Sequence, residues 1–441
     1  MASSQPPLSY IIVGAGVFGT STALHLATKY PASSVTLVDR DAHTAERRVA
    51  ASWDWNKVVR ADYRDPVYCG LAVEAQDVWR QDPLWQPYYR ETGIYWISRT
   101  GIAQRALENF ARLGRGAKDG EGRMMKIRAV PVDEAKRLYG GVFDQADYTG
   151  VENVLVNETS GWADAKGALR AATEKAVEKG VKVVKAEVRE LVFGEDGACV
   201  GVVTEEGERY TATHVILSTG AFTPKLLDRV AEKTGRDEFL VGDRIIAAGV
   251  TTGLAQLDDR TAEEFSGMPV AIQENDPERG ASNGGLPLTA DKRLKWWGQC
   301  IFKNTQTMPS GRQISAPPAS VDYAQWSVPE TLVEDIKFAN TAIFGKRGET
   351  WKITDHRICW DAVTPSEDFI ISPHPASKGL YIATCGSFHG WKFFPIIGEY
   401  VVKMLDGSLD PELQKRWAWD RERPDPLGNK VWPVKELKDL Q

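Results

Sequence analysis

Residues 10–19 read YIIVGAGVFG, and this pattern indicates the type of fold. Its first four residues are apolar, a pattern typical of a short buried strand. The glycines that follow have the spacing GxGxxG, at Gly14, Gly16 and Gly19. The first permits a tight turn, the second lets a pyrophosphate approach the backbone, and the third lets a helix pack on the strand. The stretch therefore predicts a strand followed by a helix whose N-terminal N–H groups bind phosphate.

The residues just downstream complete a strand–helix–strand unit. Small and apolar residues recur at helical spacing from Thr22 to Ala27, and residues 35–38 form a second apolar strand that ends at Asp39. A carboxylate there, 20 residues after Gly19, can accept hydrogen bonds from ribose hydroxyls and disfavours a 2′-phosphate. The unit predicts a dinucleotide site for NAD or FAD, which the motif alone does not separate, and disfavours NADP. A merely structural turn is the alternative.

Periodicity and turn residues predict the remaining elements. Glycine, proline and polar residues predict loops over 82–89, 114–126, 275–287 and 305–320. Helices are expected over 67–79, 163–179 and 395–405, and strands over 94–97, 181–184, 200–204, 213–218, 294–297 and 379–384.

Composition and charge exclude several classes of protein. The 441 residues suffice for a large core, and 54 basic against 60 acidic residues give a net charge of −6, which argues against nucleic acid or an anionic membrane as partner. No apolar run approaches the roughly 20 residues of a membrane span. The six histidines lack metal-ligand spacing, so no metal site is expected.

The five cysteines are odd in number and contain no CxxC pair, which indicates reduced thiols in an intracellular compartment. The cytosol is the expected location, on negative evidence alone. A peroxisomal location stays open, although the C-terminal residues 438–441 are not the Ser-Lys-Leu signal.

The C-terminal part carries a resemblance that separates FAD from NAD. On HRICW at 356–360 and GSFHGWKF at 386–393, together with the N-terminal unit and residues 82–93, 160–163 and 218–222, the chain resembles the flavin amine oxidases of the D-amino-acid-oxidase fold. The most similar groups are monomeric sarcosine oxidases, fungal amadoriases, and pipecolate and saccharopine oxidases.

The resemblance implies an α/β fold with two domains. A discontinuous, Rossmann-like FAD-binding domain would comprise residues 1–85, 155–238 and 350–441. A substrate domain with a mixed α+β sheet would comprise residues 86–154 and 239–349 and cover the flavin.

Several residues are implied to hold the FAD. Cys359 stands where the family attaches the flavin by a thioether to its 8α-methyl group, whereas most free cysteines are small buried hydrophobes. Lys57 takes the place of an arginine beside the flavin. The remaining contacts would come from Gly14, Gly16, Val17, Phe18, Gly19, Asp39, Arg40, Ser52, Val188, Gly220, Gly390 and Lys392.

Other residues are implied to bind and oxidise the substrate. Arg60 and Lys392 match residues that bind the substrate carboxylate, with a surface location as the alternative for both. Trp391 replaces the phenylalanine that usually precedes this lysine. Lys295, flanked by Leu294 and Trp296, would carry the charge that helps O₂ accept an electron; Lys303 or a plain exposed lysine is the alternative.

These residues predict an FAD-dependent oxidase of secondary amines. It would oxidise the C–N bond of an N-methyl amino acid, pipecolate or saccharopine type of substrate with O₂, giving an imine and H₂O₂. A fructosyl amino acid is the second choice, weakened because Gln299 stands where amadoriases have a sugar-contacting glutamate. An NAD-dependent dehydrogenase or a non-catalytic nucleotide-binding protein is the alternative class. A monomer is expected, with the amine and O₂ as its only partners.

Overall fold

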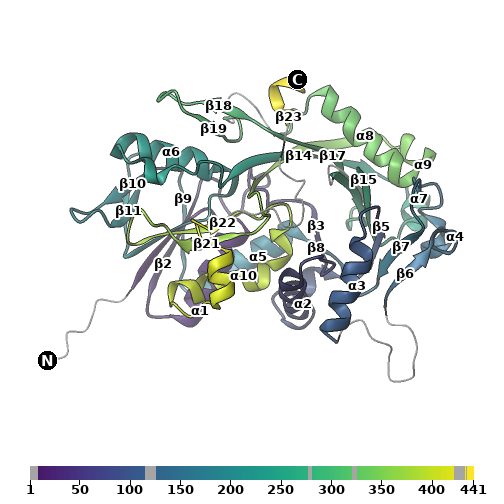
Figure 1. The fold of residues 1–441 in the computed structure, drawn as a ribbon, viewed down its shortest axis with the longest axis horizontal. Coiled ribbons are helices and arrows are strands. Elements are labelled where there is room, and N and C mark those ends of the chain that lie inside the picture. Colours follow the sequence, from purple (N-terminus) through teal and green to yellow (C-terminus); the bar gives the residue numbers. More distant parts are fainter. Residues whose placement is uncertain (1–7, 115–125, 277–280, 320–324, 422–432, 434) are drawn as a thin grey trace.

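Two sheets organise the protein. The computed structural model describes the chain apart from residues 1–7, 115–125, 277–280, 320–324, 422–432 and 434. Figure 1 shows β2, β9 and β22 with α1 and α10 on its left, and β5, β7 and β15 with α3 and α8 on its right. Strands β14 and β17 extend between the two halves.

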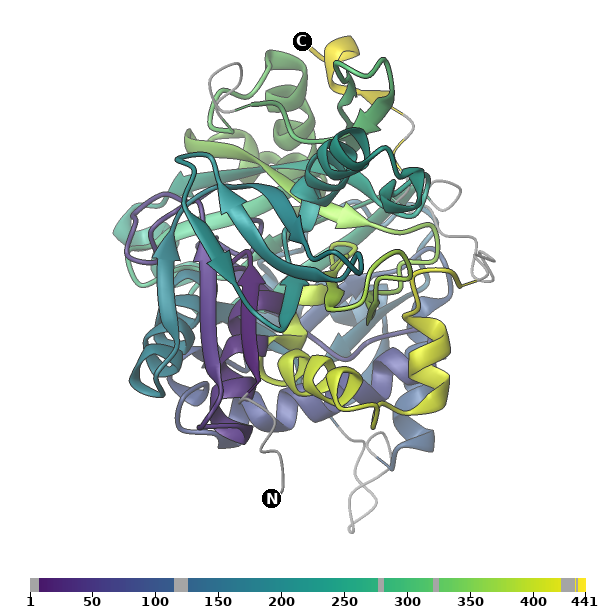
Figure 2. The same ribbon diagram turned by 90° about the vertical axis from the view of Figure 1, so that its left-hand side faces the viewer.

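The first sheet is a six-stranded, mainly parallel sheet in the order β21-β22-β13-β1-β2-β9. The central parallel strands β1, β13 and β22 are largely buried, and for this reason they read as continuous apolar runs, whereas the edge strand β9 is only partly buried. Figure 2 shows β1 and β2 side by side in purple, as their pairing requires. The strands are β1 (Ser9–Val13), β2 (Ser34–Asp39), β9 (Lys182–Lys185), β13 (His214–Leu217), β22 (Leu380–Thr384) and the antiparallel edge strand β21 (Ile370–Pro373).

Helices α1 (Val17–Lys29) and α10 (Phe394–Leu405) cover one face of this sheet in close contact. A Cβ on Gly398 would lie 2.2 Å from the Ser21 carbonyl, so only glycine permits the approach. Likewise a Cβ on Gly19 would lie 1.8 Å from the Gly14 oxygen. The third glycine of the motif therefore serves helix–strand packing, as its spacing predicts. Helices α5 (Ala165–Glu178) and α6 (Thr223–Thr234) also belong to this half.

The second sheet is mixed and runs β20-β14-β17-β16-β15-β5-β7-β6, with β23 added to β17. Its pairs are antiparallel except β15 with β5 and β17 with β23. Helix α8 (Glu330–Phe344) lies against β17, where the Trp296 indole donates to the Ile336 carbonyl at 2.7 Å. The strands are β5 (Ile94–Ile97), β6 (Ile127–Pro131), β7 (Asn153–Asn157), β14 (Ile246–Gln256), β15 (Val270–Asp276), β16 (Ala281–Leu286), β17 (Arg293–Lys303), β20 (Ile353–Val363) and β23 (Lys435–Glu436).

Smaller elements complete the fold. Three small sheets consist of β3 (Asn56–Val59), β8 (Gly161–Asp164) and β4 (Tyr89–Arg90); of β10 (Val188–Phe193), β11 (Cys199–Thr204) and β12 (Arg209–Thr211); and of β18 (Thr305–Thr307) and β19 (Gln313–Ser315). The other helices are α2 (Pro66–Gln81), α3 (Ile102–Arg112), α4 (Val132–Ala135), α7 (Asp259–Glu264), α9 (Lys346–Glu349) and α11 (Pro411–Arg416).

The predicted fold class, a Rossmann-like sheet with a mixed second sheet, is confirmed. The division into sheets differs from the expected domain segments at β20. This strand lies in the segment 350–441, expected in the FAD-binding domain, but it pairs with β14 in the second sheet. β7 also begins two residues before the expected boundary at 155, and pairs within the second sheet.

Two predicted loops are wrong. Residues 275–287 contain the end of β15 and all of β16, and residues 305–320 contain the β18–β19 hairpin. The glycines of β16 suggest a loop, but they are required by packing within the sheet. A Cβ on Gly284 would lie 2.0 Å from the Trp297 ring, and one on Gly285 would lie 2.9 Å from Phe344. These are strand glycines that make room for aromatic rings. Most of the predicted loop 114–126 lies outside the described residues.

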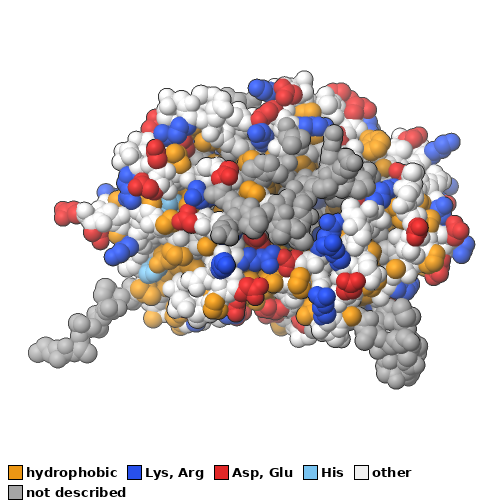
Figure 3. Space-filling model, viewed as in Figure 1, with side chains coloured by type: hydrophobic (Ala, Val, Ile, Leu, Met, Phe, Trp, Pro, Cys, Tyr) orange, Lys and Arg blue, Asp and Glu red, His pale blue; other side chains and the backbone are white. Residues whose placement is uncertain are grey.

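The distribution of surface charge and the state of the cysteines are as the sequence predicts. Acidic and basic side chains are interspersed over the face shown in Figure 3. All five cysteines are buried and free. Within the part of the chain that the structure describes, no helix is both long and apolar enough to span a membrane.

Candidate active site

A cavity of about 900 Å³ lies between the two sheets. One end is formed by the N-terminus of α1 and the ends of β2 and β13. The other end is lined by β3, β17, β20 and the segment before α10, and collects lysine and arginine side chains. Its volume is typical of small-molecule and cofactor sites.

The first end has the shape that the glycine motif predicts. Gly14 has a φ of +101°, and a Cβ there would lie 2.4 Å from the Ser218 carbonyl oxygen. The Ala15 N–H donates to the Asp39 carboxylate at 2.6 Å, and the Val17 N–H donates to Ser52 Oγ at 3.1 Å. The strand end, the carboxylate and the helix N-terminus thus meet at one edge of the cavity, as a dinucleotide requires.

Almost all residues predicted to contact the cofactor line this cavity. Gly19 alone among them does not line it, because its role is to pack α1 on β1. The lining includes Gly14, Gly16, Val17, Phe18, Asp39, Arg40, Ser52, Lys57, Val188, Gly220, Cys359, Gly390 and Lys392.

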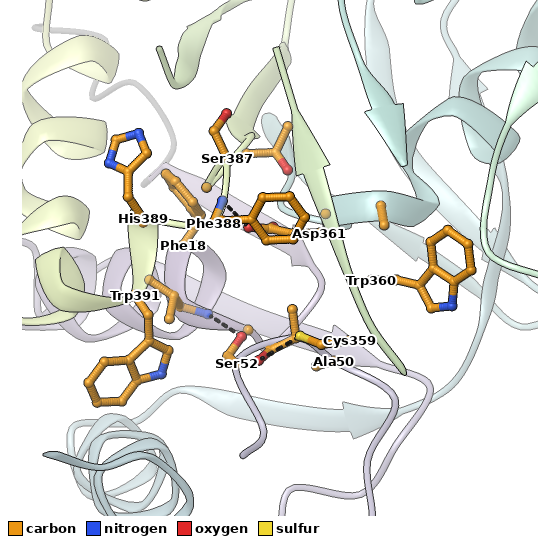
Figure 4. Close-up of a pocket in the computed structure, with 18 of the residues that line it drawn as sticks. Phe18, Ala50, Ser52, Cys359, Trp360, Asp361, Ser387, Phe388, His389 and Trp391 are labelled. Atoms are coloured by element: carbon orange, nitrogen blue, oxygen red, sulfur yellow. Dashed lines mark hydrogen bonds between the residues drawn. The ribbon is translucent and has the colours of Figure 1, made fainter. Parts of the chain in front are cut away.

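Cys359 lies on β20 and lines the cavity. Its sulfur is 3.9 Å from the Ala51 carbonyl oxygen and 3.9 Å from Lys57 Nζ. In Figure 4 its side chain points toward the segment that carries Ala50 and Ser52, whereas Trp360 points to the other side of the strand. The alternation of β20 thus aims the thiol at the cavity with a cation beside it.

A buried carboxylate joins two of the lysines. Asp54 Oδ2 lies 2.8 Å from Lys57 Nζ and 2.7 Å from Lys295 Nζ, and Lys295 also donates to the Asn56 carbonyl at 2.9 Å. Burial would raise the pKa of Asp54, but Lys295, Lys57 and Arg357 lower it well below its usual range. The carboxylate is therefore ionised and holds both lysines in place.

The two lysines differ in their titration. Burial lowers the pKa of Lys295 to about 8, with Lys57 adding to the effect and Asp54 opposing it. For Lys57, burial is outweighed by Asp54 and the Cys359 thiol, and its pKa is raised. Lys57 thus remains charged while Lys295 loses its charge in mildly alkaline solution.

Arg60 and Lys392 meet at Tyr63. The Arg60 guanidinium lies 4.9 Å from the Tyr63 ring and 4.6 Å from the Trp96 ring. Lys392 Nζ donates to the Tyr63 hydroxyl at 2.9 Å and to the His389 carbonyl at 2.8 Å. Burial, with Arg60 nearby, lowers the pKa of Lys392 well below its usual value. Both cations line the cavity, and an anion between them would relieve their repulsion.

His389 continues this hydrogen-bonded chain. Burial and the Lys392 cation lower its pKa to about 3, so it is neutral near pH 7. One ring nitrogen, Nε2, faces the Glu367 carbonyl at 2.9 Å and must donate to it. Nδ1 is then the acceptor for the Tyr63 hydroxyl at 3.0 Å. Tyr63 therefore has a fixed hydroxyl, whose oxygen faces Lys392.

The loop before α10 is held in an unusual conformation. Cys385, Ser387 and Phe388 have φ values of 70°, 45° and 61°, a region that side chains other than glycine seldom adopt. The half-buried Asp361 carboxylate accepts the Phe388 N–H at 2.7 Å, as Figure 4 shows. Beyond this loop, Trp391 lines the cavity and stacks on Trp79 with ring centroids 5.3 Å apart.

Gln299 is a predicted substrate contact that the structure places away from the cavity wall. Strand β17 bulges between Trp297 and Ile301, and the lining there is formed by Trp297, Gly298 and Ile301. The prediction rested on the resemblance alone, in which a glutamate stands four residues after the lysine, and the bulge takes this position out of the cavity lining. Lys295 itself lines the cavity, whereas its alternative Lys303 pairs with Glu436 at 3.4 Å outside it.

Sequence reasoning missed several residues of this site. Asp54 stands between two tryptophans, a setting that disfavours a solvated carboxylate and could have marked it. Tyr63 follows Arg60 by three residues and His389 lies in the quoted glycine segment, but only the tertiary contacts pair them. Among the described residues, no group of three or more His, Cys, Asp and Glu side chains could hold a metal ion.

Comparison with known proteins places these features in a family. The sequence model of a family described as FAD dependent oxidoreductase matches residues 9–404. L-saccharopine oxidase of Schizosaccharomyces pombe is 26% identical over 93% of this chain and 92% of its own length. A monomeric sarcosine oxidase of an Arthrobacter species is 23% identical over 88% and 90%. The solved structure of fructosyl peptide oxidase from E. terrenum superposes with a TM-score of 0.84 at 24% identity, covering 100% of this chain and 98% of that one.

Proposed function

Because this chain belongs to the family of FAD dependent oxidoreductases, we propose that it oxidises the C–N bond of an N-substituted amino acid with a free carboxylate. It is an FAD-dependent oxidase of CH–NH donors, in the group of the sarcosine oxidases and amadoriases. The substrate proposed within this group is of the N-methyl amino acid, pipecolate or saccharopine type.

The residues of the cavity fit FAD. Gly14 and Gly16 leave room for a diphosphate at the N-terminus of α1, since a Cβ on Gly16 would lie 2.8 Å from Ser52 Oγ. Asp39 at the end of β2 suits ribose hydroxyls. Ser218 Oγ is buried at the same edge without a hydrogen-bond partner among the described residues. We propose that Cys359 attaches the cofactor covalently, since its thiol faces the cavity beside Lys57.

When bound, FAD supplies the acceptor for two electrons from the amine and passes them to O₂, which gives H₂O₂. The protein's part is to hold the substrate and to place charge. Arg60 and Lys392 bind the carboxylate and so fix the α-carbon and the nitrogen in the cavity. That these two cations line one cavity and share Tyr63 is the observation that carries the proposal.

Lys295 places a second charge on the wall. Its ammonium, held by Asp54 and the Asn56 carbonyl, is buried and protonated below about pH 8. A preorganised cation in a dry site stabilises the negative charge that develops on O₂. We therefore assign Lys295 to O₂ activation.

Two relatives support the substrate class by their names, since one acts on saccharopine and the other on sarcosine, both N-substituted amino acids. Residue 299 is a glutamine and lies outside the cavity lining, so this position supplies no acid that a sugar could contact. A fructosyl amino acid remains the substrate against which the proposal is tested.

The test is oxygen uptake with N-methyl amino acids, pipecolate, saccharopine and a fructosyl amino acid, compared side by side. Arg60→Gln should lower kcat/KM about 10- to 100-fold for a carboxylate-bearing secondary amine, because one charge-assisted contact is lost. The methyl ester should be a poor substrate and nearly insensitive to the change. Arg105→Gln, at an exposed arginine on α3, is the control.

One result would overturn the proposal. If the fructosyl compound is oxidised far faster than the other amines and Arg60→Gln leaves that rate unchanged, Arg60 and Lys392 do not bind a substrate carboxylate. The protein would then be a fructosyl amino acid oxidase.

A further inference from the structure

The cavity contains an arginine that neither the nucleotide nor the proposed carboxylate contact uses. Arg64 lines the cavity four residues after Arg60, in the segment between β3 and α2. Its backbone is fixed, because the Asn109 side chain of α3 donates to the Tyr63 and Arg64 carbonyls at 3.0 Å. The side chain therefore projects from a rigid position into the same cavity as Arg60.

The guanidinium of Arg64 is only partly satisfied. Nη2 donates to the Thr100 carbonyl at 3.4 Å and to the Thr100 hydroxyl, while Nε is buried without a partner. Among the residues that the structure describes, no carboxylate forms an ion pair with it. Arg64 is half-buried, and leaving its buried Nε–H without an acceptor is costly unless a ligand accepts the bond.

Two carboxylates of the cavity lining, Asp65 and Glu274, are held by other groups. Asp65 accepts the Val67 N–H as the N-cap of α2 and pairs with Arg416. Glu274 accepts the Arg99 and Thr100 N–H groups at 2.7 and 3.0 Å, and also the Ser98 and Thr100 hydroxyls. Glu274 thus orients Thr100, and Thr100 accepts hydrogen bonds from Arg64. Neither Asp65 nor Glu274 forms an ion pair with the Arg64 guanidinium.

We propose that Arg64 binds a second carboxylate of the substrate, so that the preferred substrate is a secondary amine bearing two carboxylates. The inference rests on the proposed function, in which Arg60 and Lys392 hold the first carboxylate. The second one stands either on the amino acid side chain or on the nitrogen substituent. Arginine suits this task because its planar fork binds a carboxylate through two parallel hydrogen bonds.

The experiment uses pairs of substrates that differ only in charge. N-methyl-L-glutamate and N-methyl-L-glutamine place the second group on the side chain. N-(2-carboxyethyl)glycine and N-(2-carbamoylethyl)glycine place it on the nitrogen. Wild-type holoenzyme should prefer the acid of at least one pair by about 10-fold or more in kcat/KM, and the pair that responds shows where the second carboxylate stands. Arg64→Gln should abolish that preference, mainly by lowering kcat/KM for the acid toward the value for its amide.

A binding measurement that needs no turnover accompanies the kinetics. In 3-(carboxymethylthio)propanoate a sulfur replaces the amine nitrogen, so the compound binds without being oxidised. By calorimetry, wild type should bind it about 10-fold more tightly than the amide at its propanoate end. Arg64→Gln should bind both equally, Arg64→Lys should retain part of the difference, and the exposed control Arg105→Gln should retain all of it.

Two results overturn the inference. Equal kcat/KM within both pairs for wild type would do so without any variant, and so would an acid preference that survives in Arg64→Gln. If none of the four amines is oxidised while the thioether diacid still binds through Arg64, the proposed function fails and the second carboxylate site stands.

Discussion

At the scale of single residues, the site depends on cations whose charges are set by their neighbours. Lys57 and Lys295 share the Asp54 carboxylate, whereas Lys392 donates to the Tyr63 hydroxyl and the His389 carbonyl. Accordingly the pKa of Lys57 is raised, and the pKa values of Lys295 and Lys392 are lowered by burial. An anionic ligand would most favour protonation of Lys392, which has no carboxylate of its own among the described residues.

The first prediction concerns the pH dependence of the reaction with O₂. Because the pKa of Lys295 is about 8, its charge is present below that pH and lost as pH rises through it. Reoxidation of the reduced holoenzyme, followed by stopped flow, should therefore slow above pH 8. Lys295→Met should be slower by orders of magnitude and lack this pH dependence, while anaerobic reduction by substrate survives.

Asp54→Asn sharpens this test, because removing the carboxylate lowers the pKa of Lys295 further and should move the decline to lower pH. Lys303→Met on the same strand is the control and should reoxidise normally. Slow reoxidation in Lys303→Met with normal reoxidation in Lys295→Met would transfer the role to Lys303.

The second prediction concerns Cys359. Denatured wild-type protein should keep its flavin fluorescence on a gel, because a thioether survives unfolding. Cys359→Ala should release the flavin on denaturation, and Cys385→Ala, at a buried cysteine outside the cavity lining, should not. Covalent flavin in the Cys359→Ala protein would show that another residue is the attachment site.

At the scale of elements, irregular backbone shapes the cavity as much as the regular strands do. The bulge in β17 removes Gln299 from the wall and brings Gly298 onto it. The left-handed residues between β22 and α10 turn the chain so that Asp361 caps the Phe388 N–H. Strain of this kind persists where the surrounding structure compensates for it, as at functional sites.

Two helical glycines give opposite predictions for stability. Gly70 in α2 has nothing within 4 Å of an added Cβ, so Gly70→Ala should raise the free energy of unfolding by about 0.5–1 kcal/mol. In Gly398→Ala the new Cβ would lie 2.2 Å from the Ser21 backbone on α1, and the free energy should fall by about 1–3 kcal/mol or more. Urea unfolding of both variants measures the difference, and a stabilised Gly398→Ala would contradict the close contact of α1 and α10.

At the scale of the whole molecule, the cavity exists because chain segments alternate between the two sheets. β1 and β2 form its nucleotide end, the chain then contributes β5 and β7 to the second sheet, and β20 returns Cys359 to the boundary. Each half supplies some of the residues that hold one ligand. A site assembled in this way requires both sheets to be folded and in place.

We expect the protein to be a monomer. The large hydrophobic side chains exposed among the described residues are Leu8, Leu113, Val177 and Phe338. Val177 lies on α5 and Phe338 on α8, whereas Leu8 precedes β1 and Leu113 follows α3. Stable dimers bury a contiguous, more apolar surface. Sedimentation velocity should give a species near 48.8 kDa from about 1 to 100 μM. A species of twice that mass across the range would contradict this expectation.

The nucleotide half of the protein could be predicted from the amino-acid sequence. YIIVGAGVFG and Asp39 specify local geometry, in which each glycine and the carboxylate act within one strand–helix–strand unit. Cys359, Arg60, Lys295 and Lys392 were also predicted, because short motifs around them resemble a family. Periodicity located most strands and helices, since burial on one or two faces leaves its pattern in consecutive residues.

Which of these residues act together depends on contacts that form when the chain folds. Asp54 bridges lysines 3 and 241 residues away, and Tyr63 joins Arg60 to a lysine 329 residues away. The sequence of β16 resembles a loop because its glycines make room for the Trp297 and Phe344 rings. Gln299 lies outside the cavity lining because β17 bulges. These features depend on contacts between segments distant in the chain, and such contacts leave no periodic pattern in the sequence of either partner.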